Sequence, residues 1–165
     1  MTSAFVGLWN TSARWRRVAW WPSYRLCGGG RAATLAALDP GIQASAIVCM
    51  MTTFEALMPS YFDAHSWLFT TPGLARHLDH PNLTAGRARH HQLVVYAEDD
   101  LLFPPQGMLA ADRELTEHFH YGPGTYQSLF LPGPHRFDRE MQDAVKSFFA
   151  NNLLSPPGAS PTVKK

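Results

Sequence analysis

The stretch from residue 25 to residue 31 constrains the fold more than any other part of the chain. A short apolar approach leads to Cys27, three glycines follow, and a helix-forming run extends from Ala32 to Leu38. This order of strand, tight turn and helix displays one side chain at the carboxyl end of a parallel strand. It predicts an α/β fold in which Cys27 is a potential nucleophile.

Two later stretches support this interpretation. Residues 97–103 read Ala-Glu-Asp-Asp-Leu-Leu-Phe, and residues 132–138 read Pro-Gly-Pro-His-Arg-Phe-Asp. A thiol, an acidic run and a histidine therefore follow one another in the order nucleophile, acid, base. Histidine can remove a proton from a thiol, and a carboxylate can fix the histidine tautomer.

Composition excludes several classes of protein. The 165 residues are 45% hydrophobic, which suits one packed domain, and the net charge of +1 with 16% charged residues argues against nucleic-acid binding. Two cysteines cannot form a disulfide scaffold, so we expect a reducing, cytoplasmic location. We find no apolar run of about 18 residues for a membrane span and no secretory signal.

Hydrophobic periodicity predicts the order of the elements. We expect helices over residues 29–38, from Pro104 to about 119 and after an N-cap at Asp138, and strands over 44–50, 92–97 and 126–131. Residues 51–80 form a loop-rich insertion with short helices, and Cys49 is expected to be a mid-strand core residue. In the leader, either residues 17–21 or residues 23–27 form a strand.

This pattern divides the chain into three parts. Residues 1–23 are an atypical leader of unclear structure, residues 24–154 are the folded domain, and residues 155–165 are a disordered tail. The tail is rich in proline, glycine, serine and lysine, which is typical of disorder.

Several stretches resemble the second half of an α/β-hydrolase, of the group that holds acetyl xylan esterases, dienelactone hydrolases and prolyl-oligopeptidase-like enzymes. They are residues 28–30, 35–40, 50–54, 72–74, 78–79, 103–104, 108, 111–113 and 132–138. The resemblance implies a partial α/β-hydrolase fold, a mostly parallel sheet flanked by helices with the early strands missing. It also implies Cys27 as nucleophile, Asp100 as acid and His135 as base, with Asp99 as the competitor of Asp100.

The same resemblance suggests further site residues. The N–H of Gly28 would be one oxyanion-hole donor. Independently of the resemblance, a loop-rich insertion after a strand often forms the roof of a pocket, so His65 and Trp67 of residues 51–80 are candidates to lie against the substrate, with a structural role as the alternative for His65. Cysteine in place of the usual serine is similar to dienelactone hydrolases. No cofactor is expected.

Two features depart from the family pattern. Arg25 stands where the nucleophile motif has a glycine. In addition, we see no segment before Cys27 that supplies the strand and loop of the second oxyanion donor, whose loss costs about 3–4 kcal/mol of transition-state stabilisation. We therefore expect an uncovered sheet edge beside the turn.

Two hypotheses of function follow. The first is hydrolysis of small carboxylic esters or related acyl substrates through Cys27, His135 and Asp100. The alternative is a truncated, catalytically inactive relic that acts through protein association, with self-association through the exposed sheet edge.

We expect no bound metal and no nucleic-acid or membrane partner. The spacings of His90-His91 and of His118 with His120 do not place two rings on one helix face, and no thiol or carboxylate cluster accompanies them.

Overall fold

The computed structural model describes residues 6–11, 14–20, 28–65, 73–85 and 88–153. The described part of the chain forms strands, α-helices and two 3-10 turns, which follow one another as β1 (Val6–Thr11), β2 (Arg14–Trp20), α1 (Gly28–Leu38), β3 (Ile42–Val48), α2 (Phe54–Leu57), η1 (Phe62–Ala64), η2 (Leu74–Arg76), α3 (His80–Ala85), β4 (His91–Ala97), α4 (Pro105–His120), β5 (Thr125–Leu131) and α5 (Arg139–Leu153). No helix among these residues is both long enough and apolar enough to cross a membrane.

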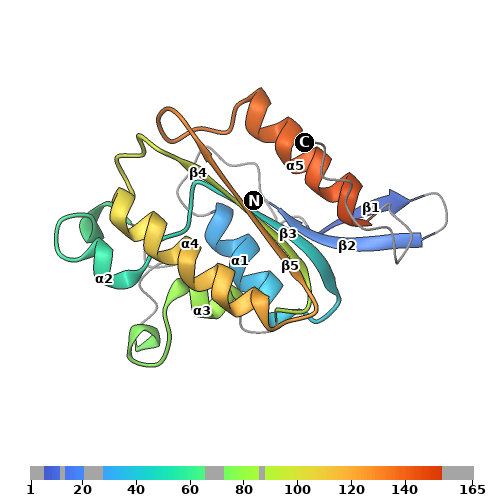
Figure 1. Cartoon of the computed structure of the whole chain (residues 1–165), viewed down its shortest axis with the longest axis horizontal. Coiled ribbons are helices and arrows are strands. Elements are labelled where there is room, and N and C mark those ends of the chain that lie inside the picture. Colours follow the sequence, from blue (N-terminus) through green and yellow to red (C-terminus); the bar gives the residue numbers. More distant parts are fainter. Residues whose placement is uncertain (1–5, 12–13, 21–27, 66–72, 86–87, 154–165) are drawn as a thin grey trace, which may run out of the picture.

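The strands form one sheet in the order β1-β2-β3-β4-β5. β1 and β2 pair antiparallel, whereas β2, β3, β4 and β5 run parallel to one another. In Figure 1 the sheet passes between α4 on one side and α5 on the other. The helices connect successive parallel strands, as such crossovers require.

Successive side chains of β3 and β4 point to opposite faces of the sheet, so the two strands contribute to a hydrophobic cluster on each face. Ile47, Val94 and Tyr96 belong to a cluster that also holds α4 residues, and Ala33 of α1 lies in the same cluster. The intervening residues of the two strands pack against α5 instead, in a cluster of Ala44, Ala46, Leu93, Val95, Ala97, Met141, Val145, Phe148, Phe149 and Leu153. Both faces of the central strands are therefore buried, which explains their nearly continuous apolar sequence.

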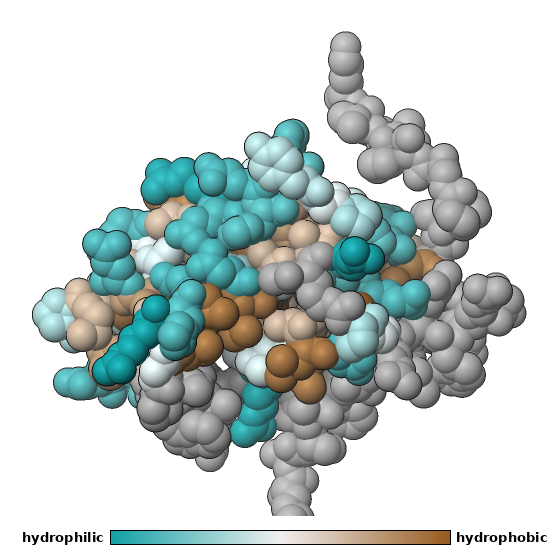
Figure 2. Space-filling view, turned by 90° about the horizontal axis from the view of Figure 1, so that it is seen from below, coloured by the Kyte–Doolittle hydropathy of each residue, from teal (hydrophilic) through white to brown (hydrophobic). Residues whose placement is uncertain are grey.

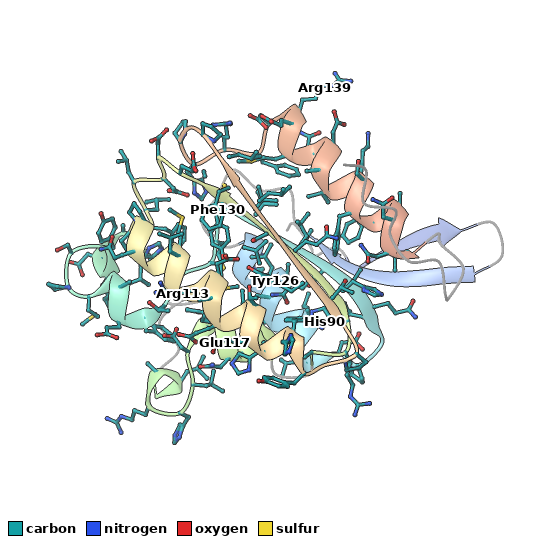
Figure 3. The ribbon with its side chains drawn as sticks, viewed as in Figure 1. His90, Arg113, Glu117, Tyr126, Phe130 and Arg139 are labelled. Atoms are coloured by element: carbon teal, nitrogen blue, oxygen red, sulfur yellow. The ribbon has the colours of Figure 1, made fainter. Side chains whose placement is uncertain are left out.

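The side chains of the edge strand β5 also alternate, between exposed and partly buried positions. Tyr126 and Phe130 lie between β5 and α4, as Figure 3 shows. Phe130 stacks on Tyr96 with ring centroids 4.4 Å apart. The Tyr126 hydroxyl donates to Oδ1 of Asp112 over 2.7 Å, so the polar end of this partly buried ring has a partner on α4.

Most of the described surface seen from below is hydrophilic, and hydrophobic residues reach it in smaller areas near its centre (Figure 2). The large hydrophobic residues that are exposed come from different elements and are Leu38, Met58, Leu101, Leu109, Tyr121 and Leu129. Exposed apolar residues of this kind are common on protein surfaces.

The main helices and strands confirm the sequence prediction. α1 begins one residue before the expected start, and Met108, Ala111, Leu115 and Phe119 are the buried face of α4. Asp138 caps α5 as predicted, because its Oδ1 accepts the N–H of Met141 over 3.1 Å.

Two predictions were wrong. The strand before the turn is not the uncovered edge of the sheet, because β2 pairs with β3 on one side and with β1 on the other, so that β1 is the outer strand. This also confirms that part of the leader forms a strand. Cys49 does not lie within a strand, since β3 ends at Val48. The alternative strand over residues 23–27 and the disordered tail fall outside the described residues.

We predict that Gly107→Ala destabilises the fold. Gly107 is buried in the first turn of α4, and a Cβ there would overlap the Thr52 hydroxyl and the Cβ of Ala56. Alanine normally gains about 1 kcal/mol over glycine within a helix. Overpacking costs about 1–3 kcal/mol, so we expect a net loss in the free energy of unfolding measured by urea denaturation.

The exposed neighbour Gln106 provides the control for this experiment. Gln106→Ala should change the free energy of unfolding by less than about 0.5 kcal/mol. A Gly107→Ala variant more stable than the wild type would contradict the packing described here.

Candidate active site

The carboxyl ends of β3, β4 and β5 meet at one edge of the sheet. One further backbone hydrogen bond follows the last paired residues of β3 with β4, and another follows those of β4 with β5. The N–H of Cys49 donates to the carbonyl of Val95 over 2.8 Å, and the N–H of Glu98 donates to that of Leu131 over 2.9 Å. The segments that follow the three strands therefore lie next to one another.

Asp100 and His135 come together at this edge. Nδ1 of His135 lies 2.7 Å from Oδ2 of Asp100, although the residues are 35 positions apart in the sequence. The other carboxylate oxygen of Asp100 accepts the N–H of Leu102 over 3.0 Å. The Asp100 side chain is 1% exposed and that of His135 is 25% exposed, so a buried carboxylate orients a ring that solvent still reaches.

Asp99 contacts Gly133, whereas Asp100 contacts His135. Its Oδ2 accepts the N–H of Gly133 over 2.9 Å, and its own N–H donates to the Gly133 carbonyl over 3.0 Å. Gly133 has φ of +112°, a value that favours glycine. Asp99 thus closes the turn before His135, and Asp100 is the carboxylate that contacts the histidine.

An aromatic stack adjoins the pair. Phe103 is buried, and its ring centroid lies 6.4 Å from that of His135 and 4.8 Å from that of His65. Nε2 of His65 donates to the Leu102 carbonyl over 2.9 Å. His65, predicted from the sequence to lie near the substrate, and His135 therefore both neighbour the ring of Phe103.

Cys49 is the third ionisable group at this edge. One ligand atom from each of Cys49, Asp100 and His135 lies within 4.8 Å of the others. The Cys49 thiol donates to the Arg136 carbonyl over 3.3 Å, and its backbone has φ of +49°. Burial raises the pKa of this thiol to about 11, so it is protonated at neutral pH.

The start of α1 is packed against the end of β3. A Cβ on Gly29 would overlap the Cβ of Met50 and would lie 3.3 Å from the Val48 carbonyl oxygen. Only a residue without a side chain permits this approach. Gly28, the predicted oxyanion donor, is the first residue of α1. Cys27 and Trp67 fall outside the described residues.

A cavity of about 230 Å³ lies at the opposite edge of the sheet. Its lining residues lie at the end of α1, at or before the start of β3 and just before β4, and are Ala36, Asp39, Pro40, Ile42, Arg89 and His90. Ligands of open α/β sheets bind at the carboxyl ends of the strands, so the edge with Asp100 and His135 is the candidate site instead.

Comparison with solved structures identifies the fold. Acetyl xylan esterase 1 from Thermoanaerobacterium sp. JW/SL YS485 matches 84% of this chain and 46% of its own length, at 18% identity and a TM-score of 0.55. A glucuronoyl esterase of carbohydrate esterase family 15 from Caldicellulosiruptor kristjansonii matches 88% of this chain and 47% of its own, at 14% identity and a TM-score of 0.60. The acylaminoacyl peptidase of Pyrococcus horikoshii matches 82% of this chain and 24% of its own, at 13% identity and a TM-score of 0.56.

The chain has the fold of the C-terminal half of an α/β-hydrolase. It spans about half the length of the two esterases. No protein-family model matches the chain, and no curated protein sequence matches it. The resemblance inferred from the sequence is therefore confirmed by three-dimensional structure, at the level of the fold.

Two residues at the carboxyl edge of the sheet, Phe103 and Cys49, were not predicted from the sequence to lie near Asp100 and His135. Phe103 ends the acidic stretch, and its position three residues after Asp100 was the signal that it could cover the pair. Cys49 is buried in the core, as predicted, but the apolar run continues through Met50 and hid the end of β3, so the place of Cys49 beside Asp100 and His135 was not predicted.

We predict that His65 makes the stability of the fold depend on pH. Burial lowers the pKa of His65 below its usual 6.5, so the unfolded chain takes up a proton more readily than the folded protein does. The free energy of unfolding therefore falls as the pH drops from about 6.5 through the pKa of the folded state.

His65→Gln retains an amide donor for the Leu102 carbonyl but cannot titrate. Chemical denaturation of both proteins at about pH 7.5 and about pH 5 should show a smaller loss of stability in the variant. An equal loss in both proteins would show that His65 does not contribute.

Proposed function

We propose that this α/β-hydrolase fold hydrolyses small carboxylic esters or related acyl substrates, with Cys27 as nucleophile, His135 as base and Asp100 as acid. The observation that carries the proposal is the bond of 2.7 Å between His135 and a buried carboxylate at the carboxyl edge of the sheet. That arrangement supports general base catalysis, because the carboxylate fixes the tautomer and stabilises the imidazolium that forms.

The chemistry proceeds in two steps. The unprotonated Nε2 of His135 takes the proton of the Cys27 thiol, and the sulfur attacks the ester carbonyl. The tetrahedral intermediate collapses to a thioester when the leaving alkoxide receives that proton from His135. Water, deprotonated in turn by His135, then releases the carboxylic acid and restores the thiol.

The position of Cys27 in the chain supports its assignment. It directly precedes Gly28, the first residue of α1, and is separated from Gly29 by one residue. Gly29, which follows Cys27 by two positions in the chain, packs against the end of β3, one of the strands whose carboxyl ends meet beside Asp100 and His135. The N–H of Gly28 lies at the amino end of a helix, which suits a donor to a developing oxyanion.

Cys49 is a poorer candidate for the nucleophile, although it lies in the same cluster as His135. It is 4% exposed, its thiol donates to a backbone carbonyl, and burial raises its pKa to about 11. A nucleophilic thiol requires a lowered pKa and access to the substrate.

We predict that an acyl group accumulates on Cys27. Incubation with a chromogenic acetyl ester, rapid acid quenching and peptide mass spectrometry should locate one acetyl group on the peptide that contains Cys27. Cys27→Ala should abolish both this adduct and the release of the chromophore. Acetylation of Cys49, or equal hydrolysis by Cys27→Ala and the wild type, would contradict the assignment.

We predict that the two neighbouring aspartates differ in their effect on the rate. Asp100→Asn should lower kcat by about 10⁴-fold, because an amide presents the wrong partner to Nδ1. Asp99→Asn preserves an oxygen that can accept the Gly133 N–H, so its kcat should fall by less than about tenfold.

Two histidine variants complete the comparison. His135→Ala should lower kcat by about 10²–10⁴-fold, whereas alanine at the exposed His120 of α4 should have no such effect. Loss of activity in Asp99→Asn equal to that in Asp100→Asn would contradict the roles proposed here. An inactive wild-type chain would favour the non-catalytic alternative.

A further inference from the structure

We propose that Cys49, Asp100 and His135 form a binding site for a thiophilic divalent cation such as Zn²⁺. One sulfur, one carboxylate oxygen and one imidazole nitrogen lie within 4.8 Å of one another. Each of these groups is an established zinc ligand, and three protein ligands leave a fourth position for water.

The distances are close to those that coordination requires. Zinc binds sulfur at about 2.3 Å and nitrogen or oxygen at about 2.0–2.2 Å, so tetrahedral ligand atoms lie roughly 3.3–3.7 Å apart. The ring nitrogen of His135 that bonds Asp100 lies 2.7 Å from the carboxylate oxygen and must move away from it by roughly 0.6–1 Å, while no separation among the three groups exceeds 4.8 Å, so shifts of about 1 Å bring them to coordination distances. His135 is the group that can supply this movement, because its side chain is 25% exposed whereas Cys49 and Asp100 are buried.

Backbone hydrogen bonds fix the positions of the two buried ligands, Asp100 and Cys49. The N–H of Leu102 donates to Oδ1 of Asp100, and the backbone of Cys49 is tied to the Val95 carbonyl. Bonds of this kind orient ligands and raise the affinity of a site.

Charge also favours the ion. A divalent cation, one thiolate and one carboxylate sum to zero, so the occupied site would bury no net charge. The thiol releases its proton to solvent, and the bond to the Arg136 carbonyl is lost. A neutral imidazole already has one unprotonated nitrogen, so His135 needs only to move its proton between its two ring nitrogens.

Occupation of this site would disable the pair of Asp100 and His135. The ion would claim the carboxylate and the ring that otherwise share one hydrogen bond over 2.7 Å. If the proposed function holds, Zn²⁺ is therefore an inhibitor of the hydrolase. Binding itself does not depend on hydrolytic activity.

Cobalt provides a test that does not require activity. Co²⁺ substitutes for Zn²⁺ and produces a near-ultraviolet charge-transfer band when a thiolate binds it. We expect the full chain to develop this band with one Co²⁺ per chain, and excess Zn²⁺ to remove it. The absence of the band would overturn the proposal.

The two cysteines of the chain make a matched pair of variants. Cys49→Ser should lose the band and Cys27→Ser should retain it, with circular dichroism used to verify that both fold. The opposite result, or a band that survives in Cys49→Ser, would overturn the proposal.

A third variant covers the case in which Cys49→Ser does not fold. His135→Ala retains the thiol but should bind Co²⁺ about 10–100-fold more weakly in a titration of the same band. Unchanged affinity would overturn the proposal. Ester hydrolysis is measured separately in metal-free buffer. A chain that binds cobalt but hydrolyses no ester without metal would refute the proposed function alone, and hydrolysis by a chain that never develops the band would refute the metal site alone.

Discussion

The hydrogen bond between Asp100 and His135 depends on the register of two parallel strands. β4 and β5 pair so that Ala97 lies beside Leu131, and Asp100 and His135 follow these strand ends by three and four positions. A slip of one residue would turn every side chain of β5 to the other face and would carry His135 away from the carboxylate. The core contacts of Tyr126 and Phe130 with α4 fix that register.

Several local contacts then stabilise the loop that contains His135. Asp99 exchanges two hydrogen bonds with Gly133, Asp138 caps α5, and Phe103 lies against the imidazole ring. Each uses a group that the sequence places within a few residues of a strand end. The approach of Asp100 to His135 is therefore a consequence of strand pairing more than of any single motif. The fold itself is shared with the compared structures at sequence identities of 13–18%.

The sequence predicted those parts of the structure that local physics determines. Helical spacing gave the buried face of α4, and the apolar runs gave β3 and β4. It could not predict the partner of β2, because pairing between strands depends on contacts that no local pattern records. Cys49 was misplaced for a related reason, since an apolar run does not mark where a strand ends and where φ becomes positive. The choice between Asp99 and Asp100 also required three-dimensional structure, because adjacent carboxylates differ only in where they point.

Proton NMR can show whether the buried carboxylate of Asp100 fixes the tautomer of His135. We expect a strongly downfield imidazole N–H resonance that belongs to Nδ1 of His135, because that proton is held in a short bond to Asp100. The resonance should disappear in His135→Gln and move upfield in Asp100→Asn. A spectrum of the folded wild type without such a resonance, or a resonance that Asp100→Asn leaves unchanged, would show that Asp100 does not hold the Nδ1 proton of His135.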